Sequence, residues 1–217
     1  MRTLKAILKA IAYALILISI SCVTASAGEV SQKDIRKRVK ELEKDGWKSM
    51  DMPLDKQVER TMERRLMTDD EGFDKYIAKT VSAKASSYSA AQMAAENIAK
   101  VRIASDIGSS VASLANVALE NNEISAAEAS TITSVSEKAK VLVSQKLGRV
   151  LTTMCVYRMA GSEYEVSITV LYDQKKAIEI ANEIVRTELA NNPKLAELIN
   201  DKKLHEAYKG GNFSENE

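Results

Sequence analysis

The residues best suited to catalysis are few and widely separated in this 217-residue chain. It has one histidine, His205, and two cysteines, Cys22 and Cys155. Cys155 lies in a β-branched run, which favours a small buried hydrophobic role, with a reactive thiol as the alternative. A Cys/His zinc site is excluded because these donors are too few. The sequence contains no GxSxG, HExxH or glycine-rich phosphate motif, so we predict no catalytic residues, no metal ligands and no cofactor.

Acidic residues are plentiful, and two functional alternatives depend on them. The run 69–72 (Asp-Asp-Glu-Gly) resembles part of a calcium loop, but its acids are adjacent, whereas an EF-hand spaces its ligands over about 12 residues. We therefore interpret it as a solvated turn. A hydrolase with paired carboxylates is an alternative that requires two acids about 5–9 Å apart in a cleft.

Aromatic side chains suggest a different alternative, a ligand-binding accessory domain. Trp47, Tyr157 and Tyr164 could form an exposed aromatic cluster that binds a carbohydrate or a peptide. A buried Trp47 would argue against its part in such a site.

The N-terminus is typical of an export signal. Arg2, Lys5 and Lys9 precede an apolar run from Ala10 to Val23, which is shorter than the roughly 20 residues of a spanning helix. The small residues Ala25-Ser26-Ala27 then predict cleavage between Ala27 and Gly28.

Lipidation of Cys22 is the alternative to this cleavage. Ser21 provides the small residue before the cysteine, but Ser19 stands where a lipoprotein signal usually has leucine. Membrane attachment is expected only if Cys22 is lipidated. Without residues 1–27, the chain has 28 basic and 30 acidic residues, and this net charge of −2 argues against nucleic acid as a partner.

Two amphipathic helices are predicted before residue 67. The first begins at a capping serine, Ser31, and ends at Gly46. Its many lysines and arginines are typical of a solvated face, with contact to anionic lipid or nucleic acid as the alternative. Residues 46–50 form a strand or an extended strip. The second helix follows Pro53, with Leu54, Val58, Met62 and Leu66 recurring every four residues.

The predicted centre of the molecule is a strand at 76–83 followed by an alanine-rich helix at 90–119. Ser86, Ser87 and Ser89 offer hydroxyl groups that could cap this helix. Its apolar residues recur at steps of three or four and predict one buried stripe, which consists of Ala94, Ile98, Val101, Ala104, Ile107, Val111, Leu114 and Ala118.

The remaining elements are a helix, a hairpin and two more helices. A capping box at Ser125 and Glu128 begins a helix to about Lys146. Strands at 149–159 and 164–172 surround a short glycine-containing loop and predict an antiparallel hairpin. The alternation of Glu165, Ser167 and Thr169 predicts that one sheet face meets water. Asp173 caps the next helix, a short helix contains Leu195, Leu198 and Ile199, and the tail from Gly210 is polar.

This order of elements predicts an α+β fold. We expect a small antiparallel sheet with one long Ala-rich helix and further helices packed on one face. The predicted organisation is a signal peptide (1–27), a single domain (28–209) and a flexible tail (210–217). Within the domain, 31–67 is an N-terminal helical segment and 76–190 is the core.

The segment from Tyr76 to Ile178 resembles the twenty-kilodalton outer-membrane lipoprotein family, whose fold also occurs as the N-terminal domain of flagellar assembly protein T. The resemblance lies in a strand, an Ala-rich helix beginning at Ala90, and a hairpin ending at Val170. The segment Ser144–Val150 is similar to uncharacterised exported proteins of Gram-negative bacteria. The resemblance implies an envelope or surface-associated structural component and supplies no catalytic residues.

These features together predict an exported, non-enzymatic cell-envelope protein with a binding or scaffolding role. We expect it in the periplasm or at the outer membrane. Its partner would be an envelope protein or a small ligand, and it could form a homo-oligomer.

Overall fold

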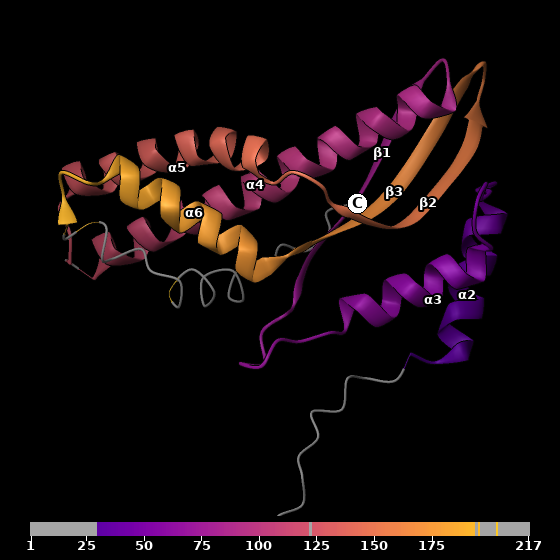
Figure 1. Cartoon of the computed structure of the whole chain (residues 1–217), viewed down its shortest axis with the longest axis horizontal. Helices are drawn as coiled ribbons and strands as arrows, with labels where there is room; N and C mark the ends of the chain where they lie inside the picture. Colours follow the sequence, from indigo (N-terminus) through magenta and orange to yellow (C-terminus); the bar gives the residue numbers. More distant parts are fainter. Residues whose placement is uncertain (1–29, 122, 194, 196–202, 204–217) are drawn as a thin grey trace, which may run out of the picture.

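A computed structural model describes residues 30–121 and 123–193, together with Leu195 and Lys203 (Figure 1). The predicted signal residues Cys22, Ala27 and Gly28 lie outside the described residues, as does the tail. In chain order, the described elements are α2 (Gln32–Lys44), α3 (Leu54–Arg65), β1 (Tyr76–Ala85), α4 (Tyr88–Glu120), α5 (Ala126–Lys146), β2 (Leu151–Ala160), β3 (Glu163–Asp173) and α6 (Gln174–Glu188). Among these helices, none is both long and apolar enough to span a membrane.

The three strands form one antiparallel sheet in the order β1-β3-β2. Ile168 of β3 lies in the centre, opposite Val81 of β1 and Cys155 of β2. The predicted hairpin is confirmed, and Gly161 in its loop has a φ of 68°, which favours glycine. The α+β class and the packing of the long helix against the sheet are also confirmed.

The long helix α4 packs on two different partners along its length (Figure 1). Near its start, the fully buried Ala91, Ala95 and Ala99 lie against the sheet. Farther along, Gly108 lies beside α5, and the Ser136 hydroxyl donates to its carbonyl at 2.7 Å. Small residues at both places allow the backbones to approach closely.

The predicted buried stripe is wrong in the first half of α4. Ile98 is 38% exposed and Val101 is 59% exposed, while the alanines on another side of the helix are buried. The stripe is correct from Ala104 onward, where Ala104, Ile107 and Val111 are buried. The buried face rotates around the helix because its partner changes from the sheet to α5.

The second face of the sheet is covered by α2 and α3. Ile35 and Leu42 of α2 and Val58 of α3 form a separate core cluster with Met154 and Val156 of β2. The expectation that the helices pack on one face of the sheet is therefore wrong.

The prediction of a water-facing row is also wrong in part. Ser167 and Thr169 are buried on this second face, and Thr169 shares a hydrogen bond of 2.9 Å with Thr80. Glu165 is half-buried. The buried Thr169 hydroxyl is thus paired with another side chain beneath a helical layer instead of meeting solvent.

The outer edge of β2 is closed by the segment that precedes and begins α3. Lys48 forms an antiparallel bridge with Tyr157, in which both backbone bonds measure 2.8 Å. The side-chain oxygen of Gln57 accepts from the Cys155 backbone N–H at 2.6 Å. The segment predicted at 46–50 is thus extended and contributes one bridge, which reduces the unpaired edge.

The predicted helix starts are confirmed by their caps. Ser31, Ser87 and Asp173 each accept a backbone N–H of the first turn, and Ser125 and Glu128 form the expected capping box. Each cap satisfies a donor that the helix itself cannot pair.

Candidate functional site

Three tyrosines meet where the start of α4 crosses the β2–β3 hairpin. The ring centroids of Tyr88 and Tyr157 are 5.6 Å apart at an interplanar angle of 81°, and those of Tyr157 and Tyr164 are 6.2 Å apart. Tyr88 and Tyr164 are 6.5 Å apart, again edge to face. All three side chains are half-buried, so part of the cluster reaches solvent.

Exposed methionines belong to the same part of the fold. Met159 follows Tyr157 by two residues on the same side of β2 and is 54% exposed. Met50 is 54% and Met52 is 37% exposed. They flank Asp51 in the chain, and Met50 comes two residues after Lys48, which pairs with Tyr157 at the edge of β2. We call the residues Met50, Met52, Tyr88, Tyr157, Met159 and Tyr164 the methionine–tyrosine surface.

This surface exists because α4 does not extend over the whole sheet. The main contacts of α4 with the sheet are to β1 and β3. Tyr157 and Met159 on β2 therefore lie beyond the helix, and the extended segment at Lys48 lies along the outer edge.

Cys155 lies beside the tyrosines and is poorly suited to be a nucleophile. Its sulfur is 3.2 Å from the Tyr88 hydroxyl. Burial raises the pKa of the Cys155 thiol above its ordinary value, although the bond to Tyr88 acts in the opposite direction. Burial and the contact with Cys155 also raise the pKa of Tyr88. Since the thiolate is the reactive form, this environment favours the packing role over the reactive one.

The structure brings together only two of the three aromatic residues that the sequence suggested as a cluster. Tyr157 and Tyr164 meet, but Trp47 packs against the core cluster of α2 and α3. There the Arg158 guanidinium lies 4.4 Å from the Trp47 ring centroid, and it also pairs with Glu165 at 2.9 Å. Arg158 and Tyr157 are neighbours on a strand and point to opposite faces, so Trp47 and the tyrosines are separated by the sheet.

The acidic run at 69–72 forms a turn closed by its own first residue. The Asp69 carboxylate accepts the backbone N–H groups of Glu71 and Phe73, both at 2.9 Å, which confirms a turn at 69–72. A different acidic residue, the partly buried Asp106, which the sequence did not single out, has its carboxylate 2.5 Å from Lys79. Among the described residues, no group of three or more His, Cys, Asp or Glu side chains could hold a metal ion.

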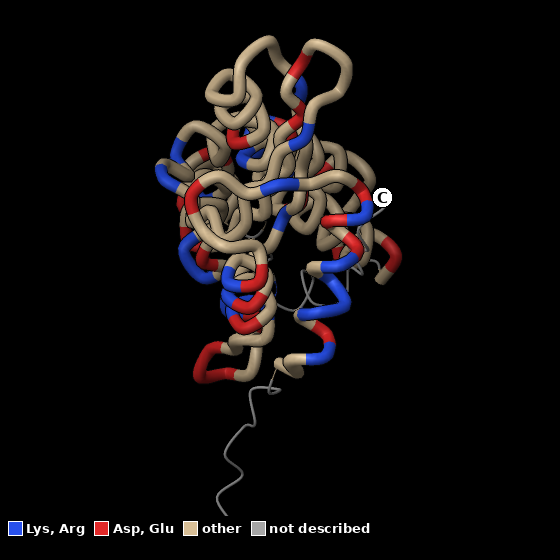
Figure 2. Tube along the Cα trace, turned by 90° about the vertical axis from the view of Figure 1, so that its right-hand side faces the viewer, with Lys and Arg blue, Asp and Glu red and all other residues tan. Residues whose placement is uncertain are grey.

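The basic residues of α2 are solvent-exposed and mixed with acidic ones. Lys33, Lys37 and Lys40 are exposed, and Arg38 pairs with Glu41 at 3.3 Å. Figure 2 shows blue and red segments interspersed along the chain. This pattern favours the solvated face over a dedicated surface for anionic lipid or nucleic acid.

No family model matches the chain, and neither the curated proteins nor the solved structures give a match. The methionine–tyrosine surface therefore comes from the geometry alone. Sequence reasoning missed Tyr88 because it lies in the first turn of a helix, far along the chain from Tyr157. The signal that could have found it is its position three residues after the end of β1, the strand that pairs with β3.

Proposed function

We propose that this chain is an exported, non-enzymatic protein of the cell envelope that binds another envelope protein through the methionine–tyrosine surface. The observation that carries the proposal is a partly exposed cluster of three tyrosines with the exposed Met159 on the same side of β2 as Tyr157. Tyrosine and methionine are enriched in the centres of protein interfaces. Flexible methionine side chains also adapt to the shape of a partner.

The sequence supports the location of this activity. The basic start, apolar run and small residues up to Ala27 are typical of an export signal. The resemblance of the segment from Tyr76 to Ile178 to envelope lipoproteins favours the same compartment. Cleavage before Gly28 would give a soluble protein of the periplasm, whereas lipidation at Cys22 would attach it to a membrane.

Site-specific crosslinking in the native envelope tests the binding surface. A photoreactive amino acid at position 159 should give a discrete adduct with one envelope protein. The same amino acid at Glu179, an exposed position on α6, provides the control and should give none. Met50→Asp should abolish the adduct at position 159 because it places a charge on the surface. Equal adducts at the two positions, or an adduct that survives Met50→Asp, would contradict the proposal.

The intact mass of the mature protein tests the location separately. A mass beginning at Gly28 in the soluble fraction supports signal cleavage, and a mass beginning at Cys22 with acyl chains supports lipidation. A mass that retains residues 1–27 in the cytoplasm would contradict export.

A further inference from the structure

Half-buried cations fall into two groups in this molecule. Between residues 30 and 193, seven lysines and arginines are half-buried. Four of them have a carboxylate within ion-pair distance: Lys79 with Asp106, Lys100 with Glu96, Lys140 with Glu137, and Arg158 with Glu165. The other three, Arg60, Arg64 and Lys75, have no carboxylate within 4 Å among the described residues.

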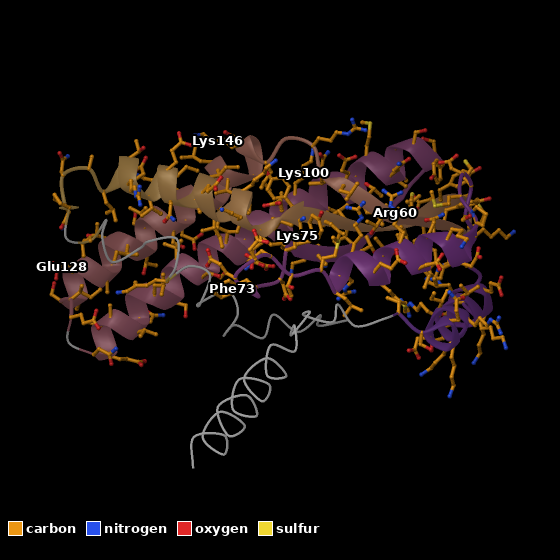
Figure 3. The ribbon with its side chains drawn as sticks, turned by 60° about the horizontal axis from the view of Figure 1, so that its bottom comes forward. Arg60, Phe73, Lys75, Lys100, Glu128 and Lys146 are labelled. Atoms are coloured by element: carbon orange, nitrogen blue, oxygen red, sulfur yellow. The ribbon has the colours of Figure 1, made fainter. Side chains whose placement is uncertain are left out.

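Two of these cations, Arg64 and Lys75, meet at Tyr76 of β1, and Arg60 lies on the same helix as Arg64. The Arg64 guanidinium donates to the Tyr76 hydroxyl at 3.3 Å, and the Lys75 ammonium lies 5.8 Å from the centroid of the same ring. Arg60 precedes Arg64 by one turn of α3 and donates to the Thr152 carbonyl at 3.3 Å. Figure 3 shows Arg60 along α3 and Lys75 beyond the end of that helix.

The contacts that these cations make leave most of their donors available. A guanidinium has five N–H groups and an ammonium has three. Arg60 and Arg64 each use one donor, in a bond longer than the usual 2.9–3.0 Å. Neither acceptor is charged. The nearby Asp173 lies opposite Tyr76 in the sheet, but its carboxylate accepts the Lys176 backbone N–H at 3.0 Å and caps α6.

Partial burial without neutralisation has an energetic cost, and an anion would remove it. Each cation loses part of its hydration, and within the described part of the chain no carboxylate lies within ion-pair distance of it. A phosphate group carries up to two negative charges and several acceptor oxygens, which suit two guanidinium forks and one ammonium. A single carboxylate would neutralise only one of the three.

From this juxtaposition we propose that Arg60, Arg64 and Lys75 form a binding site for a phosphate group. The group belongs either to a soluble phosphate compound or to the headgroup of an anionic lipid. The site lies on the face of the sheet that carries α3, whereas the methionine–tyrosine surface includes the opposite face of β2. The two sites can therefore be occupied independently.

The first experiment compares thermal unfolding in sodium phosphate and in sodium chloride at equal ionic strength. At a phosphate concentration tenfold above Kd, the Tm of the wild type should rise by about 3–6 °C beyond the general salt effect. The rise should disappear in Arg60→Gln/Arg64→Gln. It should persist in the control Arg36→Gln/Lys37→Gln, which removes the same charge from the exposed face of α2.

Lys75→Gln provides a second variant if the double substitution does not fold, because Lys75 contributes only a ring contact through its side chain. It should weaken the phosphate response while leaving the Tm in chloride nearly unchanged. An equal response to phosphate and chloride in the wild type would overturn the proposal. So would a full phosphate response in Lys75→Gln or in the double variant.

Vesicles distinguish the two sources of the phosphate group. Sedimentation is compared for the wild type and the same variants with phosphatidylglycerol and with phosphatidylcholine vesicles. Binding to phosphatidylglycerol alone that is lost in Arg60→Gln/Arg64→Gln assigns the site to a lipid headgroup. A response to inorganic phosphate without vesicle binding assigns it to a soluble phosphate compound.

Discussion

The two halves of α4 pack on their partners through different residues. The first half meets the sheet through buried alanines at every fourth position, Ala91, Ala95 and Ala99. The second half meets α5 through Gly108, where the Lys140 side-chain stem lies directly over the backbone. A flat sheet accepts a row of methyl groups, whereas a crossing helix needs one point of very close approach. The comparison teaches that one continuous helix can have two buried faces.

Where the two halves of α4 meet, a partly buried ion pair of Lys79 and Asp106 connects the helix to the sheet. Lys79 comes from β1 and Asp106 from the middle of α4, at 2.5 Å. Both side chains are less than a fifth exposed, at 18% and 14%. This pair fixes the helix on the sheet at the point where its buried face changes.

The largest expected effect on stability comes from breaking the Lys79–Asp106 ion pair. Asp106→Ala removes the carboxylate that lies 2.5 Å from the partly buried Lys79 ammonium, so unfolding should become easier by about 3 kcal/mol. Urea denaturation monitored by circular dichroism measures the change. The double variant Lys79→Met/Asp106→Leu should recover most of the loss, because apolar groups of similar size replace both charges. A loss below about 1 kcal/mol for Asp106→Ala would show that the pair behaves as a surface pair.

The next largest effect tests the contact between α4 and the sheet. Ala95→Leu inserts a larger side chain where Ala95 is fully buried, and we expect a loss of about 2 kcal/mol from overpacking. The matched control is Ala94→Leu, one residue earlier on a half-buried side of the helix, which should change stability by less than about 0.5 kcal/mol. Thermal unfolding of both variants measures which substitution lowers the stability more. If Ala94→Leu were the more damaging, the buried face would be the one that the sequence suggested.

A smaller effect tests the contact with α5. A Cβ added at Gly108 would lie 2.3 Å from the Lys140 Cγ. Gly108→Ala gains helix propensity of about 1 kcal/mol but suffers this clash, so we expect a net loss of about 1 kcal/mol. Lys140→Ala removes the clash, and Gly108→Ala should then stabilise the protein in that background. A double-mutant cycle measured by urea denaturation gives the coupling, and a coupling near zero would contradict the close approach.

The smallest effect concerns the exposed pairs that connect α5 with α6. Lys146 and Glu183 lie 3.1 Å apart, with side chains 48% and 68% exposed. Glu183→Ala should cost less than about 0.5 kcal/mol because solvent screens the pair. Thermal unfolding at low and high salt checks this. A loss of stability as large as that of Asp106→Ala would show that the exposed pair and the partly buried Lys79–Asp106 pair contribute equally.

The fold was predictable where local signals decide the structure. Serine and aspartate caps placed the helix starts, and the alternation in β3 with Gly161 placed the hairpin. The buried side of α4 near Ile98 was not predictable, because it depends on which element crosses the helix there. The same limit applies to Ser167 and Thr169, whose polar row resembles a wet face until α3 is known to cover it.

The two proposed sites were predictable only in part. Tyr157 and Tyr164 were identified from the sequence, but Tyr88 joins them only through the packing of α4 on the sheet. The cation site depends on three cations that have no carboxylate within ion-pair distance among the described residues, and a sequence rich in Glu and Asp does not show where such places are. Arg60 and Arg64 appear in the sequence as the wet side of an ordinary amphipathic helix.

The closed edge of β2 has a consequence for the order of folding. The bonds that close it join residues 98 and 92 positions apart, from Gln57 to Cys155 and from Arg60 to Thr152. Contacts of such long range form slowly, whereas the β2–β3 hairpin is local. A chain with its hairpin formed and its N-terminal segment still undocked presents an unpaired strand to its neighbours. The N-terminal segment thus protects the edge of β2 from pairing with other chains. This protection begins only when the segment packs on β2.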